Sequence, residues 1–123
     1  MLYKRRPEVA GLCVLRVSVD VLGLPGTVIT DCNAASGYVR YLAPSQWAFV
    51  NFDDVYALDW RHPDNPPRYF QHRSRKCAEV LVPHTVESKY IHGAYVADAS
   101  IGKALTDSGF KLAFTVDPVF FFR

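Results

Sequence analysis

The apolar residues of this chain lie in short stretches separated by proline and glycine, and this spacing most constrains what the chain can fold into. In residues 12–22, Leu15, Val17, Val19 and Val21 alternate with a mixed set of residues, which is the period-two pattern of a half-buried strand. Further strands are predicted at residues 27–30, 77–82, 90–98 and 111–122, the last as one or two strands broken at Pro118. Strands therefore dominate the predicted fold.

Two short helices are predicted among these strands, at residues 53–60 and 100–109, and Gly109 would end the second one. Their predicted N-terminal caps are Asp53 or Asp54 for the first and Asp98 or Ser100 for the second. Pro25 and Gly26 predict a turn before the 27–30 strand, and a polar loop, DCNAASG, follows that strand. The pattern indicates a mixed α+β fold.

Length and composition fit one domain with its own core, because the chain has 123 residues and half of them are apolar. No stretch approaches the roughly 20 apolar residues of a membrane span, and no targeting segment is recognisable. Cys13, Cys32 and Cys77 are odd in number and widely spaced, which argues against a disulfide framework and a zinc site. We therefore expect a cytoplasmic protein.

Positive charge is concentrated in residues 61–76, which carry five cations and one acid together with aromatic and histidine side chains. Pro63, Pro66 and Pro67 predict an extended loop there. Cations for phosphates and rings for bases are what a nucleic-acid groove needs. A solvated surface loop is the alternative, and composition alone favours it.

Generic catalytic motifs are missing: there is no Gly-rich phosphate loop, H-E-x-x-H motif or G-x-S-x-G elbow. The spacing of the four histidines and nine aspartates matches no standard ligand pattern, so no metal site is predicted. A single carboxylate, Glu79, lies inside the apolar 77–82 strand, directly after the cations of residues 73–76. It is expected either to pair with a neighbouring arginine or to take part in chemistry.

The order of several segments resembles the DarT family, bacterial toxins that use NAD to ADP-ribosylate thymidine in single-stranded DNA. The similar segments run from MLYKRRPE through VLRVSVDVL, PGTVITDCNAAS, FDDVYALDW, RSRKCAEVLVP and YIHGAYV to VDPVFFF, and so cover nearly the whole chain. The T-D-x-N-A-A loop and the A-E-x-L-V strand are the most specific parts. The resemblance implies an α+β fold of the ADP-ribosyltransferase type, with a strand-rich core and short peripheral helices.

On this resemblance Glu79 matches the catalytic glutamate of the family. Arg73, Arg75, Lys76 and Tyr69 are the expected DNA contacts, and Asp31, Asn33 and Tyr38 form a loop expected to line the same cleft. Alternatively, Asp31 and Asn33 hydrogen-bond their own turn. NAD would be the co-substrate, single-stranded DNA the acceptor, and an antitoxin that removes ADP-ribose the partner.

The family carries an NAD-contacting histidine and an arginine ahead of the segment that resembles MLY, and neither has a counterpart here. The resemblance therefore implies that residues 1–123 are the C-terminal portion of one DarT-like domain and that Met1 is an internal methionine of a longer protein. The alternative function is a catalytically dead remnant that keeps nucleic-acid binding. A relative that modifies RNA or protein is a third possibility, because fold does not fix function.

Overall fold

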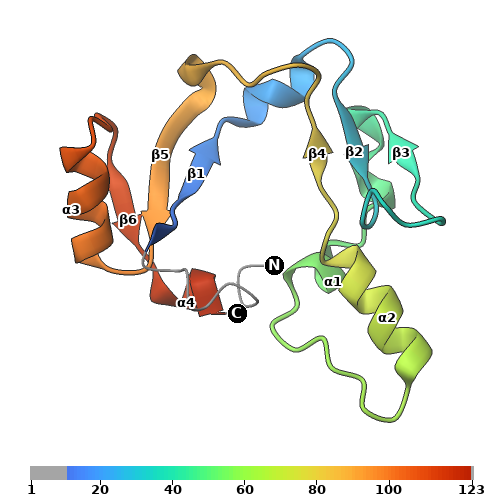
Figure 1. The fold of residues 1–123 in the computed structure, drawn as a ribbon. Coiled ribbons are helices and arrows are strands. Elements are labelled where there is room, and N and C mark those ends of the chain that lie inside the picture. The colour runs from blue at the N-terminus through green and yellow to red at the C-terminus, as the bar shows by residue number, and fades with distance from the viewer. Residues whose placement is uncertain (1–10, 123) are drawn as a thin grey trace. The chain divides into compact units, whose positions relative to one another are not determined.

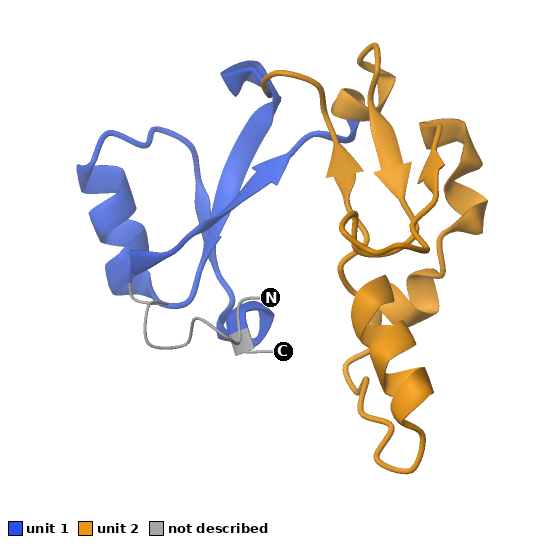
Figure 2. Cartoon of the chain, turned by 45° about the vertical axis from the view of Figure 1, so that its right-hand side comes forward, with its two compact units in different colours: residues 1–19, 86–123 blue, residues 20–85 orange. Residues whose placement is uncertain are grey.

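The computed structural model describes residues 11–122. The chain divides into two compact units, residues 1–19 with 86–123 (unit 1) and residues 20–85 (unit 2), which Figure 2 shows in blue and orange. Each unit holds a small three-stranded sheet with short helices (Figure 1). The predicted mixed α+β fold is thus confirmed.

In unit 1 the strands are β1 (Val14–Val17), β5 (Ile91–Val96) and β6 (Phe114–Val116), with β5 in the centre. β1 pairs with β5 in antiparallel fashion, and β5 pairs with β6 in parallel. The parallel pair needs a crossover, which α3 (Ala99–Asp107) supplies. The predicted strand at residues 12–22 is shorter than expected, because a 3₁₀ helix begins at Val19.

Both ends of α3 are as predicted. The Asp98 side chain accepts a hydrogen bond from the Ile101 amide (3.1 Å), so Asp98 is the cap rather than Ser100. Gly109 follows the helix with φ of +106°, a conformation that glycine adopts without steric cost.

The predicted second closing strand is wrong, because residues 118–122 form the helix α4 (Pro118–Phe122). Pro118 occupies the first position of a helix, where its missing amide donor costs nothing. The Asp117 side chain accepts from the Phe120 amide (3.1 Å) in the manner of a helix cap. Phe121 is completely buried and packs with Ala97 in the core of unit 1.

Gly102 of α3 packs directly against the ring of Phe114, and a Cβ at this position would overlap three atoms of that ring. We expect Gly102→Ala to destabilise the protein by about 1–3 kcal/mol, because overpacking forces the ring or the helix to move. Urea unfolding measures the change. Gly23→Ala is the matched control, since a Cβ there meets nothing within 4 Å; equal unfolding midpoints for both variants would contradict the prediction.

In unit 2 the sheet has the order β3 (Tyr41–Leu42), β2 (Val28–Thr30) and β4 (Val80–Leu81), and both outer strands are antiparallel to β2. The predicted turn at Pro25–Gly26 precedes β2, and Gly26 has φ of +79°. β4 has only two residues, so the predicted strand at 77–82 is shortened to its centre.

The predicted extended loop over residues 61–76 is wrong for its second half, which forms α2 (Pro66–Arg75). Pro66 and Pro67 stand at the first positions of the helix, where proline is tolerated, and the Asn65 side chain caps it by accepting from the Arg68 amide (3.1 Å). The prolines therefore begin regular structure here instead of forbidding it.

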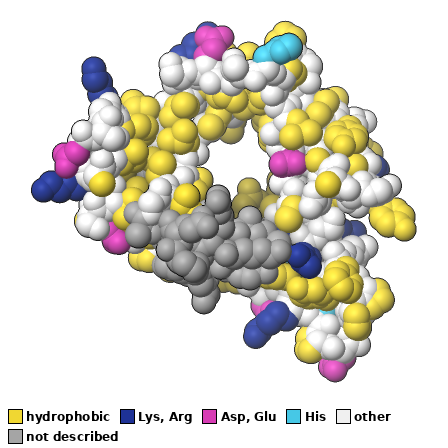
Figure 3. Space-filling model, viewed as in Figure 1, with side chains coloured by type: hydrophobic (Ala, Val, Ile, Leu, Met, Phe, Trp, Pro, Cys, Tyr) yellow, Lys and Arg dark blue, Asp and Glu magenta, His cyan; other side chains and the backbone are white. Residues whose placement is uncertain are grey.

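Two more short helices precede α2: a 3₁₀ helix, η3 (Pro44–Phe49), and α1 (Phe52–Tyr56). The predicted helix at 53–60 exists but ends at Tyr56, and its cap is Asn51, which accepts from the Asp54 amide (3.0 Å). Figure 3 shows hydrophobic side chains at the surface of both units. None of the helices described in residues 11–122 is long and apolar enough to cross a membrane.

Candidate functional site

Glu79 lies immediately before β4, and its backbone is held by Thr30 at the end of β2. The Thr30 hydroxyl accepts from the Glu79 amide (3.0 Å) and donates to the Glu79 carbonyl (3.4 Å), while the Thr30 amide also donates to that carbonyl (2.9 Å). Thr30 is only 1% exposed. The backbone that carries the Glu79 side chain is therefore fixed by a buried partner.

The Glu79 side chain is exposed and lines a cavity of about 420 Å³ within unit 2, which we call the Glu79 pocket. Its walls are mostly apolar and come from β2, η3, α1 and the start of β4. The lining residues are Leu22, Ile29, Thr30, Pro44, Trp47, Val50, Phe52, Val55, Tyr56, Ala78, Glu79 and Val80. A carboxylate among apolar walls keeps its charge less screened than at an open surface.

Three aromatic side chains of this pocket contact one another in series: Trp47 is tilted against Phe52, and Phe52 stacks on Tyr56. The ring centroids of Trp47 and Phe52 are 6.2 Å apart, and those of Phe52 and Tyr56 are 6.3 Å apart with nearly parallel planes. All three rings are substantially exposed. Exposed ring faces beside a carboxylate suit a planar, partly cationic ligand.

Within residues 11–122 the Glu79 carboxylate has no ion-pair partner. Two of the arginines that precede it in sequence bind elsewhere: Arg68 Nη2 and Arg75 Nη1 each lie 2.7 Å from a carboxylate oxygen of Asp54. The alternative that Glu79 serves only to pair with a neighbouring arginine therefore finds no support among the described residues.

Asp54 joins α1 to α2 and is only 6% exposed. Besides the two arginines, it has His72 Nε2 at 3.6 Å from its carboxylate. The hydrogen bond from Arg68, joined by the one from Arg75 and by the charge of His72, outweighs burial and lowers the pKa of Asp54 to about 2. Asp54 is therefore ionised at neutral pH and fixes the position of α2.

Two histidines continue this network. His72, which is buried, lies with Nε2 2.8 Å from the Asp54 backbone carbonyl and with Nδ1 3.0 Å from His62 Nε2. Because a carbonyl only accepts, Nε2 of His72 carries a hydrogen. The contact ties the segment before α2 to the helix itself.

The low pKa of Asp54 predicts acid sensitivity. A carboxyl whose pKa is lower in the folded than in the unfolded state stabilises the fold above its unfolded pKa near 3.8, and this stabilisation is lost as the pH falls toward 2. The loss amounts to about 2 kcal/mol, since each pKa unit is worth about 1.4 kcal/mol. Urea unfolding of wild type and Asp54→Asn between pH 5 and pH 2 measures it; parallel pH curves for the two proteins would refute the assignment.

The predicted DNA contacts differ in how freely they can reach a ligand. Arg75 is paired with Asp54, and Lys76 Nζ donates to the carbonyls of residues 55 (3.2 Å) and 57 (2.7 Å). Tyr69 stacks on Trp60 with ring centroids 5.5 Å apart. Arg73 is the cation of segment 61–76 for which the structure gives neither an ion pair nor a side-chain hydrogen bond within residues 11–122.

In the 31–38 loop the Asn33 side chain accepts from the Ala35 amide (2.9 Å), so it binds its own turn. Asp31 instead accepts from Arg40, at 2.9 Å from its amide and 2.6 Å from Nε. Burial works to raise the pKa of Asp31, but the hydrogen bonds and charge of Arg40 lower it overall. Tyr38 projects into solvent and is 93% exposed.

Several residues of the site were not predicted. Thr30, Trp47, Phe52 and Tyr56 meet around Glu79 although they are up to about 50 positions apart in sequence. The sequence signal was the clustering of aromatic residues in segment 47–60. The periodicity of this segment predicted a helix but not that its rings line a pocket. No group of three histidine, cysteine, aspartate or glutamate side chains in the described part of the chain could hold a metal ion.

Fold and site together define a mixed α+β protein with an exposed carboxylate, carried on a fixed backbone, that lines an aromatic pocket at the start of a sheet strand. The chain belongs to the DarT family, because the family model described as "ssDNA thymidine ADP-ribosyltransferase, DarT" matches residues 1–122. The predicted family resemblance is thus confirmed.

Individual relatives agree with this assignment. A DNA ADP-ribosyl transferase–DNA ADP-ribosyl glycohydrolase fusion protein of Thermosipho africanus is 29% identical over 117 residues, which cover 90% of this chain and 28% of that protein. The structure of Thermosipho africanus DarTG in complex with ADP-ribose is 26% identical in sequence, with a TM-score of 0.76. The match covers 99% of this chain and 33% of the DarTG chain. Thermus sp. 2.9 DarT in complex with carba-NAD+ is 18% identical with a TM-score of 0.77, over 98% of this chain and 65% of that one. The chain therefore spans less than two thirds of each of these relatives.

Proposed function

We propose that this chain is part of an NAD-dependent ADP-ribosyltransferase that modifies thymidine in single-stranded DNA, with Glu79 as its catalytic residue. The observation that carries the proposal is the position of Glu79, whose carboxylate lines an aromatic pocket without an ion-pair partner in residues 11–122, in a chain that matches the DarT family model. The backbone clamp by Thr30 supports the same role, because a catalytic group must be held in place.

The chemistry explains the carboxylate. When the bond between nicotinamide and ribose breaks, nicotinamide leaves with the bonding electron pair, and positive charge builds on the sugar. A fixed anion stabilises that charge in the transition state. A base nitrogen of thymidine then bonds to the same sugar carbon, and the proton that this nitrogen gives up can be accepted by the carboxylate.

NAD is the co-substrate of the proposed reaction, and the Glu79 pocket fits one end of it. The apolar walls and the adjoining rings of Trp47, Phe52 and Tyr56 suit a planar ring, and the Glu79 carboxylate can accept a hydrogen bond from a ribose hydroxyl. ADP-ribose, which the Thermosipho africanus DarTG structure holds, is the portion of NAD that would be transferred.

For the DNA side we propose that Arg73, with Arg75, Lys76 and Tyr69 nearby, contacts the backbone and bases of the strand, and that Asp31, Asn33 and Tyr38 line the cleft. Arg73 is the strongest of these, since no described partner holds it. Arg75 keeps a donor edge beyond the one bound to Asp54, because a guanidinium has five N–H groups.

The biological setting is also a proposal. The Thermosipho africanus relative is named as a fusion of a DNA ADP-ribosyl transferase with a DNA ADP-ribosyl glycohydrolase. By analogy, a toxin that modifies DNA would act with an antitoxin that removes ADP-ribose, and both would work in the cytoplasm, where the DNA and NAD are. We further propose that residues 1–123 form part of one DarT-like domain.

The test is an assay with labelled NAD and single-stranded oligonucleotides that contain thymidine. It is run on this chain and on a form extended upstream through any in-frame coding sequence. NAD-dependent labelling of DNA by either form supports the proposal, whereas labelling of RNA or protein alone would assign another acceptor. Salt-sensitive oligonucleotide binding without labelling by either form would leave a binding remnant and overturn the enzymatic proposal.

A further inference from the structure

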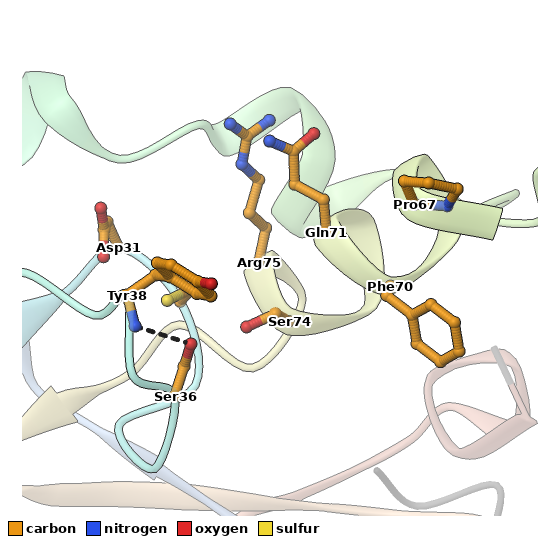
Figure 4. A pocket seen from close by; sticks show the side chains of 9 residues that line it. Asp31, Ser36, Tyr38, Pro67, Phe70, Gln71, Ser74 and Arg75 are labelled. Carbon is orange, nitrogen blue, oxygen red and sulfur yellow. Dashed lines mark hydrogen bonds between the residues drawn. The ribbon is translucent and has the colours of Figure 1, made fainter. Parts of the chain in front are cut away.

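A second cavity of about 550 Å³ lies in unit 2 between the 31–38 loop and α2 (Figure 4). We call it the Tyr38 pocket. It shares no lining residue with the Glu79 pocket, and its walls mix aromatic, polar and charged side chains. The lining residues are Asp31, Cys32, Ser36, Tyr38, Pro67, Phe70, Gln71, Ser74 and Arg75.

The pocket presents a large aromatic face to water. Tyr38 is 93% exposed, and its ring lies in Figure 4 between the Asp31 side and the Ser74 side of the cavity. Phe70 is also exposed but points away from Tyr38, so it adds a separate surface at the far rim. An aromatic ring exposed in this way is a stacking platform for another planar group.

Polar side chains of α2 line the same pocket. Gln71 Oε1 accepts from Arg68 Nη1 (3.3 Å), which leaves the Gln71 amide NH₂ to donate to a ligand. The hydroxyl of Ser74 points toward the Tyr38 side of the pocket in Figure 4. A nucleobase has both features that such a pocket complements, a π face and an edge of hydrogen-bond acceptors and donors.

The loop that carries Tyr38 is organised before any ligand binds. The Tyr38 amide donates to Ser36 Oγ (3.2 Å), the Ser36 amide donates to the Asn33 carbonyl (2.9 Å), and the Asn33 amide donates to the Ser74 carbonyl (2.9 Å). The last bond attaches the loop to the end of α2. Binding a ligand here therefore costs little ordering of the backbone.

The Tyr38 pocket adjoins the Glu79 pocket along the chain. Thr30 lines the Glu79 pocket and Asp31, the next residue, lines the Tyr38 pocket. On the other side, Ser74 and Arg75 line the Tyr38 pocket, and Ala78 and Glu79 line the other one. A strand whose base reacts beside Glu79 would thus have a neighbouring nucleotide close to Tyr38.

We propose that the Tyr38 pocket binds one nucleobase of single-stranded DNA that flanks the modified thymidine, with the base stacked on Tyr38 and its polar edge toward Gln71 and Ser74. The proposal rests on the proposed function for the nature of the strand. It makes Tyr38 a determinant of which sequence around the thymidine is modified. Arg73 and Arg75 on the same helix supply positive charge for the adjoining phosphates.

The test measures binding of single-stranded oligonucleotides by fluorescence anisotropy, and NAD-dependent labelling in parallel, for wild type, Tyr38→Ala, Tyr38→Phe and Gln71→Ala. A set of oligonucleotides with one abasic site at each position near the thymidine locates the bound base. We expect Tyr38→Ala to weaken binding of the intact strand by about 10-fold or more, Tyr38→Phe to retain it because the ring remains, and Gln71→Ala to weaken it less. For the strand in which the abasic site removes the stacked base, wild type should lose as much affinity as Tyr38→Ala loses with the intact strand. Tyr38→Ala should bind this abasic strand no more weakly than wild type does.

Each outcome decides between the proposals. Intact binding by Tyr38→Ala, or a loss that is the same for every abasic strand, would overturn the Tyr38 site even if labelling is observed. Tyr38-dependent binding without labelling would support the site and overturn the proposed enzymatic function alone. Absence of any oligonucleotide binding would overturn both. Thermal unfolding of the variants checks their fold, which an exposed side chain should leave unchanged.

Discussion

Glu79→Gln is expected to lower NAD-dependent labelling of single-stranded DNA by at least about 100-fold while the fold stays intact. The amide keeps the size of the side chain but removes the negative charge that would stabilise the sugar cation and accept the proton. The fold should not change, because the described contacts of Glu79 are made by its backbone to Thr30. Initial rates with labelled NAD, together with urea unfolding, measure the two effects on the longest active form of the protein.

Glu87→Gln is the matched control for this experiment. Glu87 is also exposed, and its carboxylate lies 3.6 Å from Lys89 at the surface of unit 1, a type of pair that contributes little to stability. Its labelling rate should remain that of wild type. Retained activity in Glu79→Gln would remove Glu79 from the catalytic role, and equal losses in both variants would point to a general effect of charge.

Asp54→Ala is expected to reduce the free energy of unfolding by about 2–3 kcal/mol at neutral pH. The substitution removes the acceptor of two arginine hydrogen bonds of 2.7 Å and leaves Arg68 and Arg75 without their shared partner. Both arginines are partly exposed and can reach water, which keeps the loss below that of a fully buried pair. Since small domains are stable by only about 5–15 kcal/mol, the loss is large.

Asp53→Ala is the control for Asp54, because Asp53 is the adjacent residue of α1 and is exposed. We expect a change within about 0.5 kcal/mol for this surface position. Denaturant unfolding compares the midpoints, and hydrogen exchange of α2 amides shows whether that helix loosens first. Unchanged midpoints in Asp54→Ala would mean that packing, and not this ion-pair network, holds α2.

Much of the fold could be predicted from local patterns. The strands β1 and β5, the Pro25–Gly26 turn, and α3 with its Asp98 cap and its terminal glycine follow from local patterns, although the predicted apolar face of β1 is exposed at Leu15 and Val17. These features depend on neighbours a few residues apart, which the sequence displays directly.

The errors have a common cause at proline. Pro66 and Pro118 both begin helices, although the sequence predicted an extended loop at the first and a broken strand at the second. Proline is tolerated in the first turn of a helix and disrupts the helix interior. Whether a proline indicates a helix start or a break therefore depends on whether a capping side chain precedes it. Asn65 and Asp117 are those caps.

The sequence by itself determined the family, the strand-rich character and the position of Glu79 in front of a short strand, because these are encoded by residue order and local periodicity. Only the tertiary structure decided the surroundings of each charge. Asp54, which the sequence offered as a helix cap, binds arginines 14 and 21 positions away, while Glu79 lines a pocket among aromatic rings. Ion pairs and pockets depend on which elements approach each other in space, and no local pattern specifies that approach.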